Sequence, residues 1–488
     1  MTQRCDVVIV GGRLAGACAA VHFARSGRDV VVLDRSKFPS DQLSTHLLFP
    51  AGVDELRQMG ALRGILAAHP TRSPWLSLST NRGHGGGASL LERWRPAGPI
   101  DYCICVPRPI QDLELVRAAR AAGAEVRERN RMLDVLWRGG RACGVRYADA
   151  DGEVHELHAR LVIGADGRRS TVASAVGAFR PYRASRNGRG LVFRYVDDPA
   201  YGTREGETIH QWRDGDSLGF MFPSAPSPKA LLLFMGAADE AAEAKRDPEG
   251  HWARKLAQHP GMAARLQGCT NPTPLRCTGD TSAYFRASSG PGWALAGDAG
   301  HFKDPVIGQG QRDALWSGRR LAEVAEPVLD EPAALDLALR RWERERDVEC
   351  LHAYHFGNLE TAVRPVSPVL TEIVRRTSRS PAPDLGDVFG RGRTITQVLS
   401  LPALVTGLAD ALVRGTGGRR ADTARDAVAE LKIHLGVRRE LLGRRFRSSQ
   451  VVPGSDHPDP CPPVAPPSRR LASVHVQEVT PSGTAVSA

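Results

Sequence analysis

The sequence predicts an α/β fold in three parts: a domain of parallel strands and helices, an inserted antiparallel sheet, and a set of C-terminal helices. Short β-branched runs alternate with helical patterns up to about residue 180. Between about 180 and 290, runs such as GLVFRYV, LGFMFP and ALLLFMG are typical of antiparallel strands. Beyond about 330 the apolar residues recur at helical spacing. A chain of 488 residues is too long for one hydrophobic core, so several domains are expected.

The first element is a compact βαβ unit. Residues 5–10 (CDVVIV) and 29–33 (DVVVL) predict two buried strands. Between them the pattern from Leu14 to Ser26 predicts a helix, which Gly27 ends. Because a glycine-rich turn joins the first strand to the helix, the unit is Rossmann-like.

The later elements are predicted in the same way. They are, in chain order, a helix at 111–122 ending at Gly123, a strand at 125–128 (EVRE), strands at 159–164 (ARLVIG) and 292–297 (GWALAG), helices at 309–325 and 334–356, and further helices within 394–447 that RGTGG interrupts.

The composition excludes several classes of protein. At 42% hydrophobic and 24% charged residues it is typical of a soluble globular chain. No uncharged segment reaches 18 residues, so no membrane span is expected. The first apolar stretch is too short for a signal peptide, which predicts a cytoplasmic protein. The nine cysteines are scattered without four-ligand spacing, so no metal site is expected.

Basic charge gathers near the C-terminus. The net charge is +11, and residues 414–447 hold ten Lys and Arg against four Asp and Glu. Without interleaved aromatics or a DNA-binding pattern, this segment predicts a solvated basic helix face and no nucleic-acid partner. An acidic protein partner is the alternative for 414–447. From 449 the chain is rich in Pro and Ser and poor in apolar residues, so 449–488 is predicted to be disordered.

The glycine-rich turn indicates a nucleotide site. The chain reads VIVGGRLAGACAA at 8–20, where a dinucleotide-binding turn reads G-x-G-x-x-G. Gly11 and Gly16 are in place, but Arg13 replaces the middle glycine. Asp34 ends the second strand, where an acidic residue bonds the ribose hydroxyls. The helix start offers free N–H groups and a positive dipole end to a pyrophosphate.

Two further motifs extend this pattern. LVIGADGRRSTV at 161–172 carries Asp166-Gly167 after a strand, and WALAGDAGHFKDPVIGQGQRDAL at 293–315 carries Gly297-Asp298 and then Gly308-Gln309-Gly310. With the glycine turn and VPRPIQDLELV at 106–116, they resemble the FAD-dependent aromatic hydroxylase superfamily. These single-component flavoprotein monooxygenases are related to flavin-dependent halogenases and geranylgeranyl reductases. The order and spacing fit over residues 5–325.

The resemblance implies an FAD site. The residues that it implies are Gly11, Gly12, Arg13, Leu14, Ala15 and Gly16 at the turn, Asp34 and Arg35 at the ribose end, Arg108 at a helix start, Met132 at the adenine, Asp166, Asp298 at the ribityl chain, and Gly308, Gln309 and Gly310 beside the flavin ring. We expect the Arg13 guanidinium beside the pyrophosphate or at the pocket entrance. A turn-forming role is the alternative for Asp166, a helix cap for Asp298, and a surface position for Arg108.

The changes of pattern and composition along the chain predict the domain boundaries. An FAD-binding domain takes 1–180 and 290–330, a substrate-binding sheet domain 181–289, a helical region 331–448 and a disordered tail 449–488.

The implied activity is that of an FAD-dependent oxidoreductase of secondary metabolism. In such a monooxygenase NADPH or NADH reduces FAD, and dioxygen then forms a C4a-hydroperoxyflavin that hydroxylates or epoxidises an aromatic or polyketide-like small molecule. A reductase of the geranylgeranyl type, which uses no oxygen, is one alternative. A halogenase is another, although its W-x-W-x-I-P signature is absent. A flavin-binding interaction protein that docks a partner through 414–447 is a third.

The catalytic residues are not identified by the sequence. Arg312 stands where many hydroxylases carry Asn, so the substrates of phenol hydroxylases do not carry over. His46 and His301 are candidate bases by position alone, and a structural role is favoured for both. The substrate pocket is expected against the inserted sheet, with Phe193, Tyr195, Phe220 and Phe222 as candidate wall residues or ordinary core residues.

Overall fold

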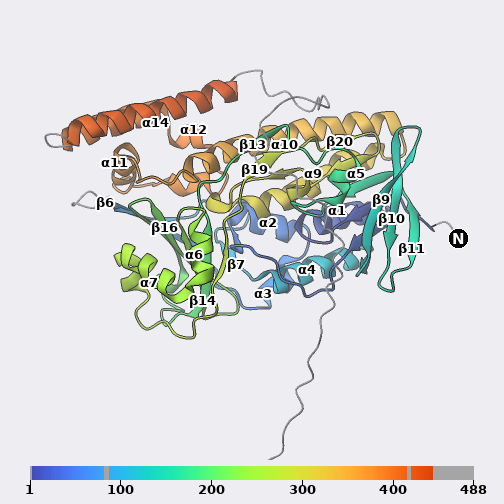
Figure 1. Cartoon of the computed structure of the whole chain (residues 1–488), viewed down its shortest axis with the longest axis horizontal. Helices are drawn as coiled ribbons and strands as arrows, with labels where there is room; N and C mark the ends of the chain where they lie inside the picture. The colour runs from blue at the N-terminus through green and yellow to red at the C-terminus, as the bar shows by residue number, and fades with distance from the viewer. Residues whose placement is uncertain (1–2, 82–86, 415–418, 443–488) are drawn as a thin grey trace, which may run out of the picture.

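The structure, a computed structural model, describes residues 3–81, 87–414 and 419–442. It has two sheet regions joined by the long helix α10 (Pro332–Glu360), which runs along the upper side of Figure 1. The predicted disordered tail and part of the basic segment 414–447 lie outside the described residues.

The first region is built on a six-stranded sheet that is parallel except for one edge strand. Its spatial order is β20 (Ser289–Gly290), β21 (Trp293–Leu295), β12 (Leu161–Gly164), β2 (Val7–Val10), β3 (Val30–Asp34) and β8 (Glu125–Glu128). All five strands predicted for this region are confirmed. Because parallel strands end at the same edge, the glycine turn, Asp34, Asp166 and Asp298 all follow strands at that edge.

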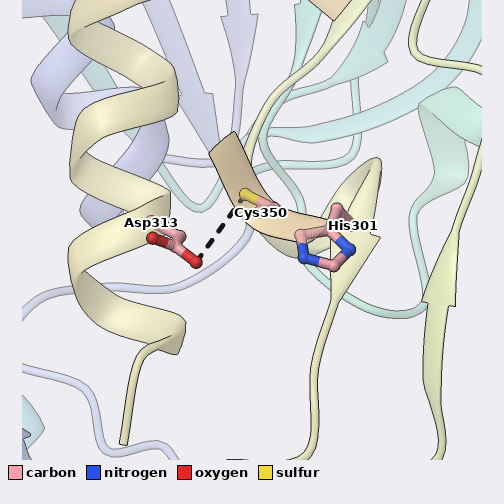
Figure 2. A group of neighbouring side chains, drawn as sticks. All are labelled: His301, Asp313 and Cys350. Atoms are coloured by element: carbon pink, nitrogen blue, oxygen red, sulfur yellow. Dashed lines mark hydrogen bonds between the residues drawn. The ribbon is translucent and has the colours of Figure 1, made fainter. Parts of the chain in front are cut away.

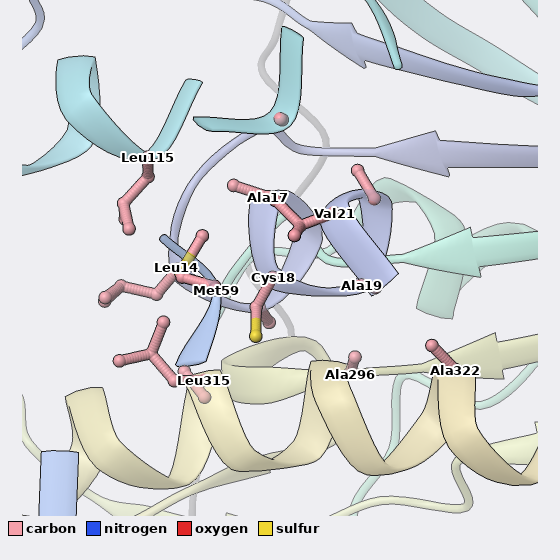
Figure 3. Packing of buried hydrophobic residues seen from close by; sticks show 14 of the residues in the cluster. Leu14, Ala17, Cys18, Ala19, Val21, Met59, Leu115, Ala296, Leu315 and Ala322 are labelled. Carbon is pink, nitrogen blue, oxygen red and sulfur yellow. The ribbon is translucent and has the colours of Figure 1, made fainter. Parts of the chain in front are cut away.

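Both faces of this sheet are covered, so its strands read as continuous apolar runs. Helices α1 (Leu14–Arg25), α4 (Arg108–Ala121) and α9 (Gly310–Ala325) pack on one face. Figure 3 shows Leu14, Cys18 and Leu315 in this packing. The α1–α9 contact is close because Gly318 has no side chain: a Cβ there would lie 2.2 Å from the Ala15 carbonyl oxygen.

The opposite face is covered by a four-stranded sheet that the sequence did not predict. Its order is β1 (Gln3–Arg4), β11 (Val154–His158), β10 (Arg141–Ala148) and β9 (Arg131–Arg138). Valines of the central sheet, such as Val8 and Val162, pack against its Val145 and Leu157.

The second region is a seven-stranded sheet. Its order is β18 (Arg276–Thr278), β14 (Leu191–Asp197), β17 (Lys229–Met235), β16 (Ser217–Pro223), β15 (Thr208–Asp214), β5 (Trp75–Asn81) and β6 (Gly87–Arg93). The sheet draws β5 and β6 from before residue 181, so it extends beyond the predicted range 181–289. It is antiparallel except for the parallel pair β15 and β5.

This sheet is also buried on two sides. Leu231, Leu233 and Met235 of β17 face a cluster that includes residues of α10, α11 and α13. Alternate residues such as Leu232 and Phe234 face a second cluster that includes Trp252 of α7. The run ALLLFM is therefore apolar throughout, without the alternation of a half-exposed strand.

The remaining elements connect and cover these regions. They are α2 (Pro50–Gln58), α3 (Leu62–Leu66), α5 (Thr171–Ala175), α6 (Glu240–Arg246), α7 (Pro248–Gln258), α8 (Pro260–Arg265), the pair β4 (Leu47–Leu48) and β7 (Ile104–Cys105), and the small sheet of β13 (Arg183–Ser185), β19 (Ala283–Phe285) and β22 (His301–Phe302).

The C-terminal helices predicted from the sequence are present. After α10 come α11 (Pro368–Thr377), α12 (Ile395–Val398), α13 (Leu401–Arg414) and α14 (Arg419–Leu442). They lie at the same end of the molecule as the seven-stranded sheet (Figure 1). None of the described helices combines the length and apolarity that crossing a membrane requires.

Candidate functional site

The glycine turn packs so closely against the end of β12 that there is no room for a side chain at its glycine positions. Gly11 has φ +103°, and a Cβ there would lie 2.3 Å from the Ala165 carbonyl oxygen. A Cβ on Gly16 would lie 1.8 Å from the Gly11 carbonyl oxygen. Both glycines are therefore required by close backbone approach, which brings the start of α1 to the strand end.

The start of α1 offers unpaired donors. The backbone N–H groups of Leu14, Ala15 and Gly16 have no acceptor among the described residues, and no acidic residue stands in the first turn. All three residues are buried. Free N–H groups at a helix start attract an anion, because the helix dipole adds positive charge there.

Asp34 lies beside this turn with its carboxylate fixed by backbone donors. Its Oδ2 accepts from Gly12 N at 2.7 Å, and its Oδ1 accepts from Ser36 N at 2.8 Å. Each oxygen keeps a further acceptor position for a ligand hydroxyl. Arg35 beside it is exposed, and Met132 is buried on β9 in a cluster with Leu33.

Arg13 points away from the glycine turn toward α4 and the loop after β3. Its guanidinium pairs with Asp112 and donates to Ser40 Oγ at 2.9 Å. Its Cζ lies 5.3 Å from the centre of the Phe38 ring. The side chain that breaks the motif is thus held by protein groups, and its contact with a pyrophosphate stays a prediction.

Arg108 meets Arg13 at the same carboxylate. Arg108 Nε donates to Asp112 Oδ1 at 2.8 Å, and Asp112 is fully buried. Arg108 itself is only 8% exposed, so it does not occupy the surface position that was its alternative. Asp112 was not predicted as a site residue, although its spacing of four from Arg108 on one helix was a signal.

The Asp166 carboxylate is used within the protein. It accepts from Ser170 Oγ at 2.5 Å and from Thr171 N at 2.6 Å, at the start of α5. Its backbone, by contrast, lies against Gly11. Asp166 therefore shapes the glycine turn through its main chain, while its side chain stabilises a helix start.

Asp298 has the opposite environment. Its carboxylate has no hydrogen-bond partner in the described part of the chain, and burial raises its pKa, although the positive charges of Arg168, Arg108 and Lys303 partly offset this. Its main-chain oxygen accepts from Tyr284 Oη at 2.6 Å. A half-buried carboxylate without a donor is suited to the hydroxyl groups of a ligand.

These observations fit FAD. The free N–H groups of α1 would hold the pyrophosphate, Asp34 the ribose hydroxyls, and Asp298 the hydroxyls of the ribityl chain. All of these groups lie at one edge of the parallel sheet.

The predicted flavin loop makes contact with a C-terminal segment. Gly308 has φ +63°, and a Cβ there would lie 2.9 Å from the Phe49 ring. Gln309 is only 2% exposed: its Nε2 donates to the Phe389 carbonyl oxygen at 2.7 Å, and its Oε1 accepts from Arg391 Nε at 2.8 Å. The Gln309 side chain therefore anchors the segment 385–393. Its carbonyl oxygen accepts from Asp313 N, which leaves its backbone N–H for a ligand.

A buried ionic cluster lies behind this loop. Arg391 donates to both carboxylate oxygens of Asp313, at 2.7 and 2.8 Å. Asp313 also pairs with Lys303 and, at 3.0 Å, with Arg312. Burial lowers the pKa of Lys303 to about 7, despite the nearby Asp298.

Figure 2 shows Asp313 of this cluster together with its neighbours His301 and Cys350. The potential metal-ligand atoms of these three residues lie within 4.8 Å of one another. Cys350 Sγ donates to Asp313 Oδ2 at 3.7 Å. The Asp313 carboxylate already pairs with Lys303, Arg312 and Arg391, so the place carries an excess of positive charge that disfavours a metal cation.

A small apolar pocket lies between the seven-stranded sheet and the flavin loop. We call it the apolar pocket, and its lining residues are Thr45, Leu47, Phe49, Leu76, Trp94, Ile209, Gln211, Phe220, Phe222, Leu233, Met235, Pro305, Val306, Ile307, Gly308 and Phe389.

Two of the four predicted wall aromatics, Phe220 and Phe222, line this pocket. Phe193 and Tyr195 are instead the neighbours of His46, with ring centres 6.1 Å from it. Trp94, Gln211 and Phe389 were not predicted. These residues reach the pocket through strand pairing and through the packing of the C-terminal chain against the flavin loop. Neither arrangement produces a local pattern in the sequence.

The two candidate bases are both buried and neutral. Tyr195 Oη lies 2.5 Å from His46 Nδ1, and burial, assisted by the charge of Arg108, lowers the pKa of His46 to about 3. Burial also lowers the pKa of His301 well below its usual value, and its Nδ1 lies 2.8 Å from the Tyr284 carbonyl oxygen. Groups with such low pKa values are weak bases at neutral pH.

The sequence matches a known family over most of its length, including the strands of both sheet regions. The family described as the FAD binding domain matches residues 4–337.

Among curated proteins, the chain is 26% identical over 465 residues to a rifampicin monooxygenase of Streptomyces venezuelae, covering 92% of this chain and 84% of that protein. It is 27% identical over 344 residues to a menaquinone reductase of Mycolicibacterium smegmatis, covering 66% and 77%. It is 31% identical over 360 residues to digeranylgeranylglycerophospholipid reductase 2 of Methanothermobacter thermautotrophicus, covering 69% and 82%.

Solved structures share the fold. The myxobacterial chondrochloren halogenase superposes with a TM-score of 0.64 at 22% identity, covering 90% of this chain and 97% of that chain. A probable FAD-dependent monooxygenase from Pseudomonas aeruginosa superposes with a TM-score of 0.59 at 20% identity, covering 74% and 94%.

Proposed function

The chain belongs to the FAD binding domain family, and from this premise we propose that it is a monooxygenase that uses NADH or NADPH to oxidise an aromatic or polyketide-like small molecule. That it is an FAD-dependent oxidoreductase follows from the family. The substrate and the type of oxidation are the proposed part.

The observation that carries the proposal is the position of the apolar pocket. One wall is the sheet, with Phe220 and Phe222, and the other is the loop 305–308 beside the predicted flavin site. A ring substrate bound there would lie next to the reactive part of the cofactor. A monooxygenase of Streptomyces venezuelae that is named for rifampicin, and that matches over 92% of this chain, supports the same class.

When bound, FAD would supply the two-electron chemistry and the activation of dioxygen. The protein would bind the cofactor and shield the substrate side of the site from water. Asp34, Asp298 and the N–H groups of residues 14–16 would fix the cofactor. Phe49, Phe389 and the sheet would exclude water from the substrate side. The positive charge of Arg108 near Asp298 would stabilise negative charge at the site.

A reductase that needs no oxygen is the second candidate function. The observation that favours it is the apolarity of the pocket, which suits an unsaturated hydrocarbon chain as well as a ring. The menaquinone reductase and digeranylgeranylglycerophospholipid reductase relatives support this reading.

The test is a measurement of FAD content followed by a screen of NADH and NADPH consumption against a panel of neutral and charged aromatic compounds. We expect purified protein to contain FAD and to consume reductant faster with part of the panel, with oxygenated products in mass analysis. Protein that binds no FAD, or that consumes no reductant with any flavin or substrate, would contradict the proposal.

A further inference from the structure

Helix α14 lies at the outer edge of the molecule, at the end that holds the seven-stranded sheet (Figure 1). It carries most of the basic segment 414–447, to which the proposed function gives no role. Its inner side is fixed to α12, because Arg438 Nη2 donates to the carbonyl oxygens of Thr396 and Leu399, at 3.1 and 3.2 Å. His434, one turn earlier on α14, is only 6% exposed. The other side of the helix is left to face solvent.

Five side chains form one line along the solvent-facing side of α14, and we call them the mixed line. They are Arg425, Val428, Lys432, Leu435 and Arg439, and all five are exposed. Their spacing of three and four residues keeps them on one face of a helix. From Arg425 to Arg439 the line is roughly 21 Å long, at 1.5 Å of rise per residue. The mixed line is therefore long enough to contact a partner over about four helical turns.

Cationic and apolar residues alternate along the mixed line. Arg425, Lys432 and Arg439 recur every seven residues, and Val428 and Leu435 stand between them. No acidic residue occupies any of these five positions. Lys432 and Arg439 form no ion pair within the part of the chain that the structure describes, so their charges remain for a partner. Val428 and Leu435, at 49% and 47% exposure, have apolar surface left to bury.

A second copy of this chain does not fit the mixed line. Two lines that pair in antiparallel fashion about Lys432 set lysine against lysine and Arg425 against Arg439. Parallel pairing in register sets every cation against its own counterpart. Because like charges placed opposite each other repel, the two aliphatic residues would have to overcome three repulsive pairs.

A lipid surface and a nucleic acid also fit less well. A helix that lies in a membrane interface gathers its apolar residues on one face and its cations on another. On the mixed line the cations lie between the apolar residues, so both kinds would have to enter the membrane to the same depth. A phosphate backbone would pair with the cations but would cover Val428 and Leu435 with charge. The line also has no aromatic side chain on which a base could stack.

We propose that the mixed line is a docking surface for an acidic helix of a partner protein. Carboxylates that recur every seven residues on that helix would pair with the three cations of the line, and aliphatic residues between them would cover Val428 and Leu435. The alternation fixes the register, because a shift of one turn sets carboxylates against aliphatic side chains. None of the five residues lines the apolar pocket, so the inference does not depend on the reaction that the enzyme catalyses.

The test measures how two labelled synthetic peptides bind to the full-length, FAD-loaded protein, by fluorescence anisotropy. The acidic probe is three copies of Glu-Ala-Ala-Leu-Ala-Ala-Gln, whose glutamates and leucines match the spacing of the mixed line. The neutral probe has Gln in place of each Glu. We expect the acidic probe to bind at least about tenfold more tightly at low salt, and to lose most of this advantage at high salt because exposed charges are screened.

Charge reversal on the mixed line should reduce binding of the acidic probe. Lys432→Glu and Arg439→Glu should each weaken it by about 3- to 10-fold, since each replaces an attraction by a repulsion at an exposed place. Leu435→Ser should weaken both probes by about 3-fold, because it removes apolar surface that either peptide buries. Arg340→Glu is the matched control: Arg340 is exposed on α10, outside the mixed line, so the same change of net charge should leave both affinities unaltered.

Equal affinity for the two peptides, or no binding of either, would overturn the proposal. It would also fail if Lys432→Glu and Arg439→Glu behaved like Arg340→Glu. Vesicles of phosphatidylglycerol and phosphatidylcholine and a short DNA duplex are measured in parallel. Binding to either of them that is tighter than binding of the acidic probe, and that Lys432→Glu abolishes, would assign the line to a membrane or a nucleic acid instead. Dimers of the protein that Lys432→Glu dissociates would assign it to a second copy.

Discussion

At the scale of single residues, the carboxylate of Asp112 connects two arginines of the site. It pairs with Arg13 from the glycine turn and with Arg108 from its own helix, and it has no exposed surface. Arg13 occupies the place of the motif's middle glycine, but its backbone still turns as the motif requires. The guanidinium finds its partners on α4 and in the loop after β3, so the departure from the motif leaves the helix start free.

Replacing Arg13 by glycine tests this account. Arg13→Gly should keep FAD bound, because the N–H groups of the turn remain. It should lower the free energy of unfolding by roughly 1–3 kcal/mol, because Asp112 loses one of two cations in a buried place. FAD content and urea unfolding measure the two effects. Complete loss of FAD would show that the arginine is part of the cofactor cradle.

Replacing Asp298 should have opposite effects on the stability of the FAD-free protein and on FAD binding. Burial disfavours the charged form of its carboxylate, and no donor compensates for this in the described residues. Asp298→Asn should therefore raise the melting temperature of the FAD-free protein while weakening FAD binding by about tenfold, because a charge-assisted hydrogen bond to the ligand is lost.

Asp166→Asn is the matched control, since the Asp166 carboxylate accepts from Ser170 and Thr171 within the protein. It should lower the melting temperature of the FAD-free protein. If Asp298→Asn also lowered it and left FAD affinity unchanged, Asp298 would have a structural role only.

At the scale of elements, β6 and the segment 385–393 meet at a buried carboxyl. Glu92 is 3% exposed, and its Oε1 accepts from Gly386 N at 2.5 Å. Burial raises the pKa of Glu92 to about 7. The folded protein therefore binds a proton at this carboxyl that the unfolded chain releases near pH 4.5.

The free energy of unfolding should consequently fall as the pH rises from about 5 to about 8, because the folded state must then ionise a buried group. Glu92→Gln should flatten this part of the pH profile, and the difference between the two proteins should approach about 3 kcal/mol. Urea unfolding at several pH values measures it. Parallel profiles for the two proteins would contradict the assignment.

The segment 385–393 is attached to the flavin loop mainly through Arg391. This residue has φ +62° and donates to Gln309, to Asp313 and to the Glu349 carbonyl oxygen. Arg391→Met should release the segment, at a cost of roughly 2–4 kcal/mol for a broken buried ion pair. Amide hydrogen exchange at 385–393 should then speed up.

Arg393→Met is the control for this change, because Arg393 pairs with Asp384 and donates to the Gln397 carbonyl oxygen, outside the flavin loop. It should speed up hydrogen exchange at 385–393 much less than Arg391→Met does, because its partners lie outside the flavin loop. Similar exchange in both variants would mean that Arg391 does not hold the segment.

The elements that sequence predicts best are those with local signals. The βαβ unit, β8, β12, β21 and α9 each carry their own apolar period and end signal, so they were expected within a few residues. The strands β9 to β11 and the pair β5 and β6 were not expected. β5 pairs in parallel with β15, which lies more than a hundred residues away. Neither segment alone carries a sequence signal for such long-range pairing.

At the scale of the whole molecule, the site also combines residues that local sequence signals predict with residues that only long-range packing brings together. Gly11, Gly16, Asp34 and Asp298 belong to motifs with fixed spacing, and the structure brings them to one sheet edge. The pocket combines β5, Trp94, β15 to β17, the loop 305–308 and Phe389 from the C-terminal chain. This combination becomes visible only when strand register and packing are known.

The whole molecule thus places an apolar, nearly uncharged pocket against the loop that ends at the predicted flavin site. This arrangement predicts oxygen transfer to a substrate held in that pocket. The reductase alternative uses the same pocket without oxygen, so the origin of the oxygen in the product separates the two.

The most direct measurement is product analysis after turnover under isotopically labelled dioxygen, with NADPH or NADH and a substrate found in the screen. We expect a product that carries one oxygen atom from dioxygen. A saturated or reduced product without the label, formed equally well in the absence of oxygen, would contradict it.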